Sequence, residues 1–450
     1  MTHLTNFTDS TSSTINVYIV AAKRTPIVKA GLDLKDLPLP YLGTALLRNI
    51  LDNYPALQQK GVPLSFELIL GNVYSPPRYN NIARAVASMA GLPANTADTI
   101  AYTINQHSAS GMQALIQAAT KIKATGKTSS RFIFAGGIES MSQYPLLLSR
   151  ELTNILNNLH KLNQERGKVG IRIRERLAAL LKIRLKDFIP VSAMEQYCNY
   201  PIGMVSSAES LNREFDISRE EQDLYAHNSH LRAIQAQKEG RFYDELVPLV
   251  VGTRIDRILT HDIGPKADSS LTRLANLPVI FDKKSGSVTA GNSFDISDGA
   301  AILLLAAEDV LQEYSLKPLA KIITFSSRTS SEPNSSEPNS SETKSCIVDV
   351  LQKSKLRIED IDLFEIEDAF SSQILALQKV IAQELAPIPQ EKINVNGGAI
   401  SLGYPLGANA ARMVVTLVHE LRRRKGKYGL AALGGAGKGE SAAIIIENQD

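Results

Sequence analysis

One short stretch near residue 108 has the residue types of a turn that presents a nucleophile. Residues 104–115 read INQHSASGMQAL, so a strand-like run ends where a helix-like run begins. Backbone N–H groups at the start of a helix favour developing negative charge, and small residues such as those at 108–111 let a substrate approach closely. Ser108 is therefore either a nucleophile or the residue that has replaced one.

A serine nucleophile needs a strong base beside it, because a hydroxyl gives up its proton far less readily than a thiol with a pKa of about 8.5. His107 is adjacent to Ser108 and is one candidate base. Successive side chains on a strand or turn diverge, however, which favours a packing or surface role for His107. His227 and His230 have no acidic or cysteine partner at ligand spacing, so no metal site is expected.

The bulk composition narrows the class of protein. The chain has 450 residues, two cysteines and a formal net charge of +3. Cys198 and Cys346 are too few for a disulfide framework and fit a reducing compartment, and the near-neutral charge gives no reason to expect nucleic acid as a partner. No apolar run is long enough to span a membrane, and residues 1–14 have neither the charge nor the apolar core of a targeting peptide. We expect a disordered tail over 1–14 and a cytoplasmic protein.

The elements that must position Ser108 follow from hydrophobic periodicity. Runs of β-branched residues alternate with segments of helical spacing, which predicts a largely parallel sheet with ligands at the carboxyl ends of its strands. The second half repeats the order of strand, small-residue turn and helix, which indicates an internal duplication. The expected strands are 17–22, 66–74, 98–104 and 132–145, followed later by a strand and turn over 361–370 and a strand hairpin over 428–447. The expected helices are 41–54, 80–92, 111–126 and 217–242, together with a glycine-rich turn that opens a helix over 393–427.

Residues 150–190 interrupt this alternation. They contain ten Lys and Arg against four Asp and Glu, a net charge of +6, with leucines at helical intervals. A basic amphipathic segment fits an interfacial helix on anionic lipid or on a partner. A solvated helical hairpin packed on its own domain fits equally, and both interpretations stay open here.

Two further segments have clear local signals. Ser218 is followed three residues later by Glu221, which predicts a capping box at the start of the helix in 217–242. Residues 330–339 repeat Ser-Ser-Glu-Pro-Asn twice, and such low-complexity sequence predicts a disordered insertion, which we place over 326–345.

Five stretches together resemble the thiolases of fatty-acid oxidation and acetyl-CoA metabolism. The resemblance extends in order over residues 15–448. Residues 150–190 and EDAFSSQILA at 367–376 are most similar to the β-subunit of the trifunctional fatty-acid oxidation complex, where the basic segment is tied to membrane and partner-subunit contact. The five stretches are KRTPIVKAG (23–31), SASGMQA (108–114), GGIESMS (136–142), ISREEQDLYAHNSH (217–230) and NVNGGAISLGYPLGANAARM (394–413).

The resemblance implies an α/β fold of duplicated βαβαβαββ halves in a five-layered α-β-α-β-α core. It also implies an inserted helical loop domain, assembly into homo- or hetero-oligomers, and coenzyme A or acyl-CoA as substrate or ligand with no resident cofactor. The reaction it implies is cleavage of a 3-ketoacyl-CoA by coenzyme A, or condensation of two acetyl-CoA. The implied domains are 15–145 with about 283–305, the insertion at 146–282, and 306–450.

The sequence departs from the family pattern where that reaction needs its chemical groups. The family's nucleophilic cysteine position is Ser108, and the histidine of its Gly-His-Pro motif is Tyr404. An oxyanion-hole position is Glu367, and the second cysteine falls at Gly434 or Leu433. The resemblance places Phe294, Gly398 and Gly437 beside bound coenzyme A, with Phe294 where the family has a serine.

Three functions remain open at this point. The first is a protein without ordinary thiolase catalysis that binds acyl-CoA or serves as a partner subunit. The second is an altered acyltransferase that forms an acyl ester on Ser108, assisted by His107, Glu367 or Tyr404. The third is residual 3-ketoacyl-CoA thiolase activity. An unperturbed tyrosine, with a pKa of about 10, is a weak base, and a carboxylate at 367 would repel an enolate, so the sequence favours the first.

Overall fold

The computed structural model describes most of the chain. It covers residues 15–58, 66–92, 99–125, 132–164, 169–184, 191–192, 202–252, 256–329, 340–434 and 440–450. The tail over 1–14, the Ser-Ser-Glu-Pro-Asn repeat, Cys198 and Gly437 lie outside the described residues.

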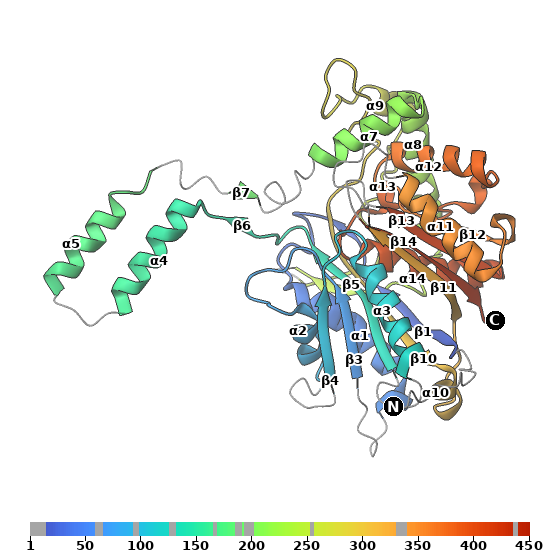
Figure 1. The fold of residues 1–450 in the computed structure, drawn as a ribbon, viewed down its shortest axis with the longest axis horizontal. Helices are drawn as coiled ribbons and strands as arrows, with labels where there is room; N and C mark the ends of the chain where they lie inside the picture. The colour runs from blue at the N-terminus through green and yellow to red at the C-terminus, as the bar shows by residue number, and fades with distance from the viewer. Residues whose placement is uncertain are drawn as a thin grey trace, which may run out of the picture.

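The N-terminal half has the order βαβαβαββ, with the last strand separated from the others by a long insertion (Figure 1). A two-residue strand, β2 (Val28–Lys29), pairs with the start of β10. The elements of this half are β1 (Val17–Arg24), α1 (Leu39–Asn53), β3 (Phe66–Gly71), α2 (Ile82–Met89), β4 (Thr99–Ile104), α3 (Ser110–Thr125), β5 (Phe132–Ser140) and β10 (Ser297–Ala307).

The C-terminal half follows the same order after a short helix, α10 (Glu308–Glu313). Where the first half has β4, this half has a single parallel bridge between Phe364 and Ile393. Its elements are β11 (Ala320–Thr329), α11 (Ser340–Ser354), β12 (Leu363–Ile366), α12 (Ser371–Glu384), α13 (Ala399–Leu402), α14 (Asn409–Arg424), β13 (Tyr428–Gly434) and β14 (Glu440–Asn448).

The strands form one mixed sheet in the order β12-β13-β14-β11-β1-β10-β5-β3-β4. Its two halves join where Val17–Ile19 of β1 pair antiparallel with Ala320–Ile322 of β11. The expectation of a largely parallel sheet was wrong. Among the strand pairs of this sheet in the described residues, β3–β4, β3–β5 and β12–β13 are parallel and the others are antiparallel. The insertion returns the chain to the edge where β5 ends, so β10 runs back antiparallel to it, with Asp298 opposite Ser140.

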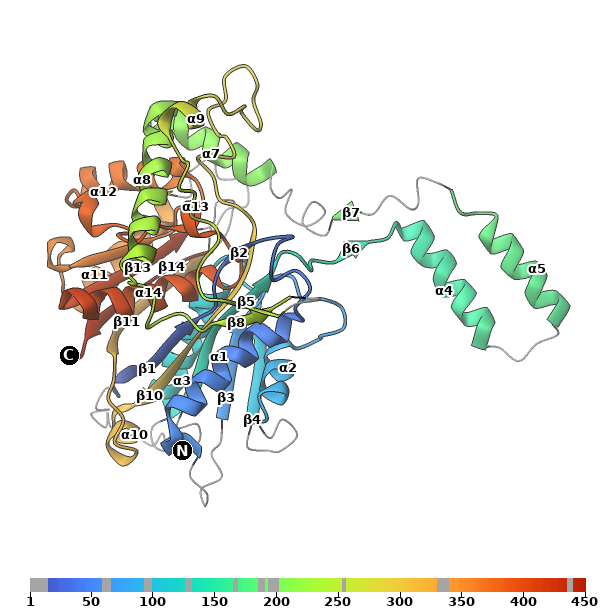
Figure 2. The ribbon, with the colours of Figure 1, turned by 180° about the vertical axis from the view of Figure 1, so that it is seen from behind.

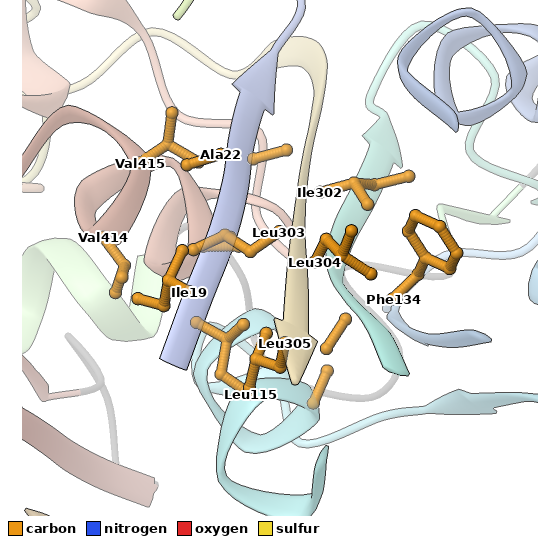
Figure 3. Close-up of a cluster of buried hydrophobic side chains, with 14 of the residues drawn as sticks. Ile19, Ala22, Leu115, Phe134, Ile302, Leu303, Leu304, Leu305, Val414 and Val415 are labelled. Atoms are coloured by element: carbon orange, nitrogen blue, oxygen red, sulfur yellow. The ribbon is translucent and has the colours of Figure 1, made fainter. Parts of the chain in front are cut away.

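Helices cover both faces of each half of the sheet, giving the five expected layers. Helices α1 and α2 pack on the outer face of the N-terminal strands, and α11 and α12 lie on the outer side of the C-terminal half. Helices α3 and α14 pack against each other between the two sets of strands. Figure 3 shows the resulting core, where Ile19 and Leu303 of the sheet meet Leu115 of α3 and Val414 of α14. Each buried side chain of this size contributes about 1.5–3 kcal/mol to folding.

The insertion contains short strands and most of the remaining helices. The predicted capping box is confirmed, because Ser218 and Glu221 each accept the other's backbone N–H. The elements are β6 (Leu146–Leu147), α4 (Arg150–Gln164), α5 (Val169–Leu180), β7 (Val191–Ser192), α7 (Ile202–Glu214), α8 (Arg219–Lys238), β8 (Leu249–Val251), β9 (Arg257–Leu259) and α9 (Leu271–Ala275).

The hairpin α4–α5 lies apart from the rest of the molecule in both views (Figures 1 and 2). Its two helices contact each other. Leu156, Leu177, Leu180 and Leu181 are exposed on it, and 85% of Leu181 is accessible to solvent. No helix in the described part of the chain is long and apolar enough to cross a bilayer.

The bounds of the expected disordered insertion need correction. Residues 326–329 complete β11, where they pair with β14, and residues 340–345 form the first turns of α11. The polar composition of these two flanking segments led to the wrong prediction of disorder. Their regular structure depends on strand pairing and helix packing with partners far away in the chain.

Candidate functional site

The carboxyl ends of β3, β4 and β5 meet at one edge of the sheet around Glu139. This fully buried carboxyl accepts four hydrogen bonds. Its Oε1 accepts from the Asn72 amide at 2.9 Å and from the Tyr74 N–H at 3.1 Å. Its Oε2 accepts from the Val73 N–H at 3.0 Å and from the Gly407 N–H at 2.9 Å. The Gly407 bond links the N-terminal strands to the loop before α14, so Glu139 holds the two halves together.

Burial raises the pKa of Glu139 to about 7, although the three backbone N–H groups favour the charged form. Asp298 lies close by and raises the Glu139 pKa further. Asp298 itself accepts from the Ser140 hydroxyl and the Ser142 N–H. Buried carboxyls with this many donors fix loop positions, so this part of the site is a well-supported frame.

Ser108 lies in the turn between β4 and α3, two residues before the helix begins. The turn is fixed by Ser110, whose hydroxyl accepts from the Gln106 N–H at 2.8 Å and donates to the His107 carbonyl at 2.5 Å. Ser108 is 5% exposed. No hydrogen bond joins its hydroxyl to another described residue, so no base is positioned to take its proton.

His107 does not serve as that base in this conformation. Its backbone has a φ of 45°, in the left-handed region that non-glycine residues rarely adopt. Its side chain is exposed while Ser108 is buried, so the two side chains diverge, as we expected from their adjacency.

Glu367 and Tyr404 meet directly. Glu367 follows β12, and Tyr404 follows the short helix α13, and both side chains are almost completely buried. The Tyr404 hydroxyl donates to Glu367 Oε1 at 2.6 Å. The side chains at the expected base position and the expected oxyanion-hole position are therefore paired with each other.

The second oxygen of Glu367 is unusual among the buried carboxylate oxygens. Glu367 Oε2 has no hydrogen-bond partner among the described residues, although the amides of Gln373 and Asn409 lie close enough to oppose a rise in its pKa. Burial nevertheless raises the Glu367 pKa to about 7. Gln373 Nε2 donates to the Gly434 carbonyl, and Gln373 Oε1 is also buried without a partner in the described structure.

Asp368 has a supporting role next to this pair. Its Oδ1 accepts from the Ala399 N–H at 2.5 Å, and its Oδ2 accepts from the Tyr225 hydroxyl at 3.1 Å. A Cβ at Gly398 would lie 2.2 Å from the Asp368 carboxylate, so only glycine fits there. The Gly398 position, which we expected beside coenzyme A, therefore faces Asp368. Burial raises the Asp368 pKa to about 6.

Gly434 is the last residue of β13, and its carbonyl accepts the hydrogen bond from Gln373. A Cβ built there would lie 1.7 Å from the Thr343 hydroxyl of α11 and 3.0 Å from the Ser441 hydroxyl. The space that a second cysteine would need at position 434 is thus taken by Thr343. Leu433, the alternative position, is a fully buried core residue.

Phe294 packs into the centre of the site. Its ring lies 4.7 Å from the Tyr404 ring and 5.5 Å from the Phe370 ring, measured between centroids. Its N–H donates to the Ala369 carbonyl at 2.9 Å, which holds the segment against the loop after β12. The same apolar cluster includes Met141 of the N-terminal half and Met204 of the insertion, so all three parts of the chain contribute to it.

Of the predicted site residues, Glu367 and Phe294 both contact Tyr404 in the structure. Gly434 accepts a hydrogen bond from Gln373, whose side chain lies next to this group. The Ser108 turn reaches the C-terminal half through α3, because a Cβ at Gly111 would lie 3.0 Å from the Gly407 carbonyl.

Sequence reasoning missed Gln373, Asn409 and Thr343. No local pattern marks them, since their roles depend on neighbours from other elements. No cluster of three metal-ligating side chains is found in the described part of the chain.

A buried ion pair supports α14 next to the site. The Arg412 guanidinium contacts Glu365 Oε2 at 3.1 Å and the Asn409 side-chain oxygen at 3.0 Å. Burial raises the Glu365 pKa to about 8 despite the opposing charge of Arg412. The Arg412 guanidinium is therefore held by Glu365 of β12 and Asn409 of α14, and no ion pair joins it to Glu367 in the described structure.

Comparison with known proteins gives a consistent result over nearly the whole chain. The family model described as the thiolase N-terminal domain matches residues 17–309, and the one described as the thiolase C-terminal domain matches residues 316–448. A probable acetyl-CoA acyltransferase of Staphylococcus aureus is 34% identical over 435 residues, covering 96% of this chain and 98% of that protein.

Two solved structures are similar in fold and sequence. The acetyl-CoA acetyltransferase of Bacillus anthracis superposes with a TM-score of 0.79 at 33% identity, covering 97% of this chain and all of that one. Human mitochondrial 3-ketoacyl-CoA thiolase superposes with a TM-score of 0.78 at 32% identity, covering 97% of this chain and 99% of that one.

Proposed function

The chain belongs to the thiolase family, and from this membership we propose that it binds acyl-CoA but does not carry out the ordinary thiolase reaction. That reaction needs a thiolate nucleophile, a histidine base, a second acid–base cysteine and donors for two oxyanions. By the family resemblance, this chain has Ser108 and Tyr404 at the first two positions and Gly434 or Leu433 at the third.

The observation that carries the proposal is the buried hydrogen bond from Tyr404 to Glu367, 2.6 Å long. Tyr404 uses its hydroxyl proton in this bond, so it is a donor to a carboxyl and not an acceptor for the Ser108 proton. Ser108 has no other base within hydrogen-bonding reach in the described structure. An unassisted serine hydroxyl is a poor nucleophile.

The frame around these residues supports ligand binding. Glu139 and Gly407 keep the two halves in contact at the edge where the strands end. The apolar cluster around Met141, Met204 and Phe294 offers a surface for an acyl chain.

The test is to incubate the protein with acetyl-CoA and with a long-chain acyl-CoA. Intact mass, melting temperature and thiolysis of acetoacetyl-CoA are then measured on the same preparation. We expect a rise in melting temperature with ligand, no added acyl mass and no thiolysis above background. Ser108→Ala is the matched control, and it should behave like the wild type in all three measurements.

Three outcomes would contradict the proposal. An added acyl mass that maps to Ser108 and disappears in Ser108→Ala would indicate an altered acyltransferase. CoA-dependent cleavage of acetoacetyl-CoA or of a long-chain 3-ketoacyl-CoA would indicate that thiolase activity persists. Absence of any ligand effect would remove acyl-CoA binding and leave a partner-subunit role.

We also propose that the hairpin α4–α5 contacts an anionic membrane surface. The supporting observation is its position away from the body, with Leu177, Leu180 and Leu181 exposed on a segment of net charge +6 over 150–190. Exposed leucines beside basic side chains favour insertion at the headgroup boundary of anionic lipid.

Co-sedimentation with vesicles tests this second proposal. Binding to phosphatidylserine vesicles should exceed binding to phosphatidylcholine vesicles and should weaken with salt. Leu177→Asn with Leu181→Asn should reduce it, whereas Ile258→Asn should not, because Ile258 is an exposed apolar residue of β9 outside the hairpin. Equal binding to both lipids, or none, would contradict it.

Assembly with a second subunit is a further proposal that follows from family membership. Strand β4 is the last strand of the sheet order, and Ile100 on it is 44% exposed. An end strand with exposed apolar side chains favours pairing with another chain. Sedimentation should show a dimer or larger species, and a monomer at micromolar concentration would contradict this proposal.

A further inference from the structure

Residues 292–297 cross the candidate site as a short segment, here called the strap, that leads into β10. Backbone hydrogen bonds tie the strap to both loops of the C-terminal half that form the site. The Phe294 N–H donates to the Ala369 carbonyl at 2.9 Å, and the Tyr404 N–H donates to the Asp295 carbonyl at 3.1 Å. Bonds on both sides of Phe294 therefore fix the position of its backbone.

The Phe294 ring is the outermost of three aromatic rings in contact. It meets the Phe370 ring edge to face and the Tyr404 ring at a tilt. Phe370 is 2% exposed and Tyr404 is 1% exposed, whereas Phe294 is only partly buried. A ligand that approaches from solvent therefore meets Phe294 before it meets the other two rings.

The side chain of Asp295 fixes the strap through charged contacts. Its Oδ1 lies 2.9 Å from the Lys29 ammonium of β2, and its Oδ2 lies 3.2 Å from the Lys266 ammonium of the insertion. The Lys266 N–H in turn donates to His230 Nδ1 of α8 at 3.2 Å. All three parts of the chain therefore hold the strap in place.

The Ser108 turn borders the same aromatic cluster from the N-terminal half. Asn105 Nδ2 donates to the Val73 carbonyl at 3.1 Å, which joins this turn to the loop after β3. Val73 and Tyr74 of that loop pack with Phe294 in one apolar cluster. Ser108 itself is only 5% exposed.

We propose that the strap is a fixed partition, which keeps the acyl group of a bound acyl-CoA on the solvent side of the Phe294 ring and out of reach of Ser108. Phe294 is then a specificity-determining residue, because its accessible surface contacts the acyl chain while its buried surface closes the way inward. This inference rests on the proposed function for its ligand. It gives a reason for the absence of acyl transfer that is independent of the missing base.

The closure is measured without any ligand, by labelling Ser108→Cys with iodoacetamide and mapping the label by peptide mass. The introduced thiol should react slowly while the strap is intact. Adding Phe294→Ala should speed the labelling by about tenfold or more, because the reagent no longer waits for the strap to open. Adding Asp295→Asn instead should speed it about threefold, since it weakens two partly exposed ion pairs.

Cys346 is an internal control for the fold, because it is fully buried in α11. Its labelling should stay slow in every variant. Phe281→Ala is the matched control, since it removes a ring that is 46% exposed, and it should not speed the labelling of the introduced thiol.

Two labelling results would overturn the closure. One is fast labelling of Ser108→Cys alone, and the other is no acceleration by Phe294→Ala. If Phe294→Ala also exposes Cys346, the Asp295→Asn variant decides, and the absence of any acceleration there would overturn the inference.

The ligand half is tested with acetyl-CoA. Attack by the introduced thiolate on the thioester carbonyl would move the acetyl group to the new sulfur and release coenzyme A as the free thiol. We expect this acetyl group on Ser108→Cys combined with Phe294→Ala, and not on Ser108→Cys alone. Acetylation of Ser108→Cys alone would overturn the partition.

Two further outcomes separate this inference from the proposed function. Binding of acetyl-CoA to the double variant without acetylation would overturn the role of Phe294 as the barrier. If acetyl-CoA raises no melting temperature, the proposed function fails and the ligand half fails with it, whereas the labelling rates still decide whether the strap closes the way to Ser108.

Discussion

Two buried carboxyls, Glu139 in the N-terminal half and Glu367 in the C-terminal half, have opposite surroundings. Both follow or end a strand at the edge where the site lies, and burial raises the pKa of each to about 7. Glu139 accepts four hydrogen bonds, three of them from backbone N–H groups. Glu367 accepts a hydrogen bond from Tyr404, and its second oxygen has no partner in the described structure.

This difference indicates that Glu139 is part of the structural framework, whereas Glu367 is part of the reactive centre. Backbone donors depend on the fold and survive changes of side chain, so the surroundings of Glu139 persist as long as the chain folds this way. The surroundings of Glu367 consist of side chains from several elements, and a change at Tyr404 or Gln373 alters them directly. A family scaffold can therefore remain intact while its reactive centre changes.

Removing the framework carboxyl should have the largest effect on stability. Glu139→Ala leaves three backbone N–H groups without an acceptor and leaves the Asn72 amide with the Ile138 carbonyl alone. We therefore expect the free energy of unfolding to fall by about 3–5 kcal/mol. Denaturant unfolding measures this, with Glu384→Ala as the surface control that should change stability by under about 0.5 kcal/mol. A loss below about 1 kcal/mol for Glu139→Ala would remove the contrast between the two carboxyls.

The pH dependence of stability should reveal Glu367. Its folded pKa of about 7 lies above the ordinary value of 4.5, so the folded state binds the proton more tightly than the unfolded state. The stabilisation is complete below pH 4.5 and is lost as pH rises towards 7, at up to about 1.4 kcal/mol per pH unit and roughly 3 kcal/mol in all.

Glu367→Gln cannot lose a proton, so the wild type should lose stability more steeply than this variant across that window. Urea unfolding at a series of pH values measures the difference. Glu139 and Glu365 titrate in both proteins, so their contributions cancel. Asp368 interacts with Glu367, so any change in the titration of Asp368 is part of the measured difference. Parallel curves for the two proteins would show that Glu367 does not titrate on unfolding.

Restoring the second cysteine should cost stability at the C-terminal centre. Gly434→Cys places a Cβ against the Thr343 hydroxyl, and overpacking of this kind costs about 1–3 kcal/mol. Adding Thr343→Ala should recover most of the loss, and the double-mutant cycle gives the coupling between the two positions. Additive effects would mean that Thr343 does not fill the space of the cysteine.

Opening the aromatic cluster should have the smallest effect on stability and a visible effect on binding. Phe294→Ala removes a partly buried ring between Tyr404 and Phe370, so we expect a loss of about 1–2 kcal/mol. A long-chain acyl-CoA should bind more weakly to this variant by calorimetry, because the ring belongs to the proposed acyl-chain surface. Phe281→Ala, which removes a ring that is 46% exposed, is the control. Equal binding of the long-chain acyl-CoA by the two variants would remove Phe294 from the acyl-chain surface.

Local sequence patterns predicted the helices and strands well but not the relative directions of the strands in the sheet. Strands such as β1 and β3 are continuous β-branched or apolar runs, and the capping box before α8 is a local signal. The antiparallel return of β10 depends on where a long insertion brings the chain back, and no residue near β10 encodes that.

The candidate site was predicted residue by residue, but its contacts were not. The family resemblance placed Glu367 and Tyr404 in the site from separate motifs, and their hydrogen bond appears only once β12 and the loop after α13 are brought together. Thr343 was assigned to the disordered insertion, yet its hydroxyl fills the space beside Gly434. That contact joins α11 to the end of β13, and sequence spacing alone cannot reveal it.

The place of β1 in the sheet has a consequence for synthesis on the ribosome. Both neighbours of β1, which ends at Arg24, come much later in the chain, because β10 begins at Ser297 and β11 at Ala320. At about 5–20 residues per second, the first strand to be made waits roughly tens of seconds for its partners. During that time β3, β4 and β5 can assemble, but β5 keeps an open edge and β1 remains an unpaired apolar segment. We therefore expect the nascent chain to depend on chaperones over this interval, and truncated chains that end before Ser297 to aggregate.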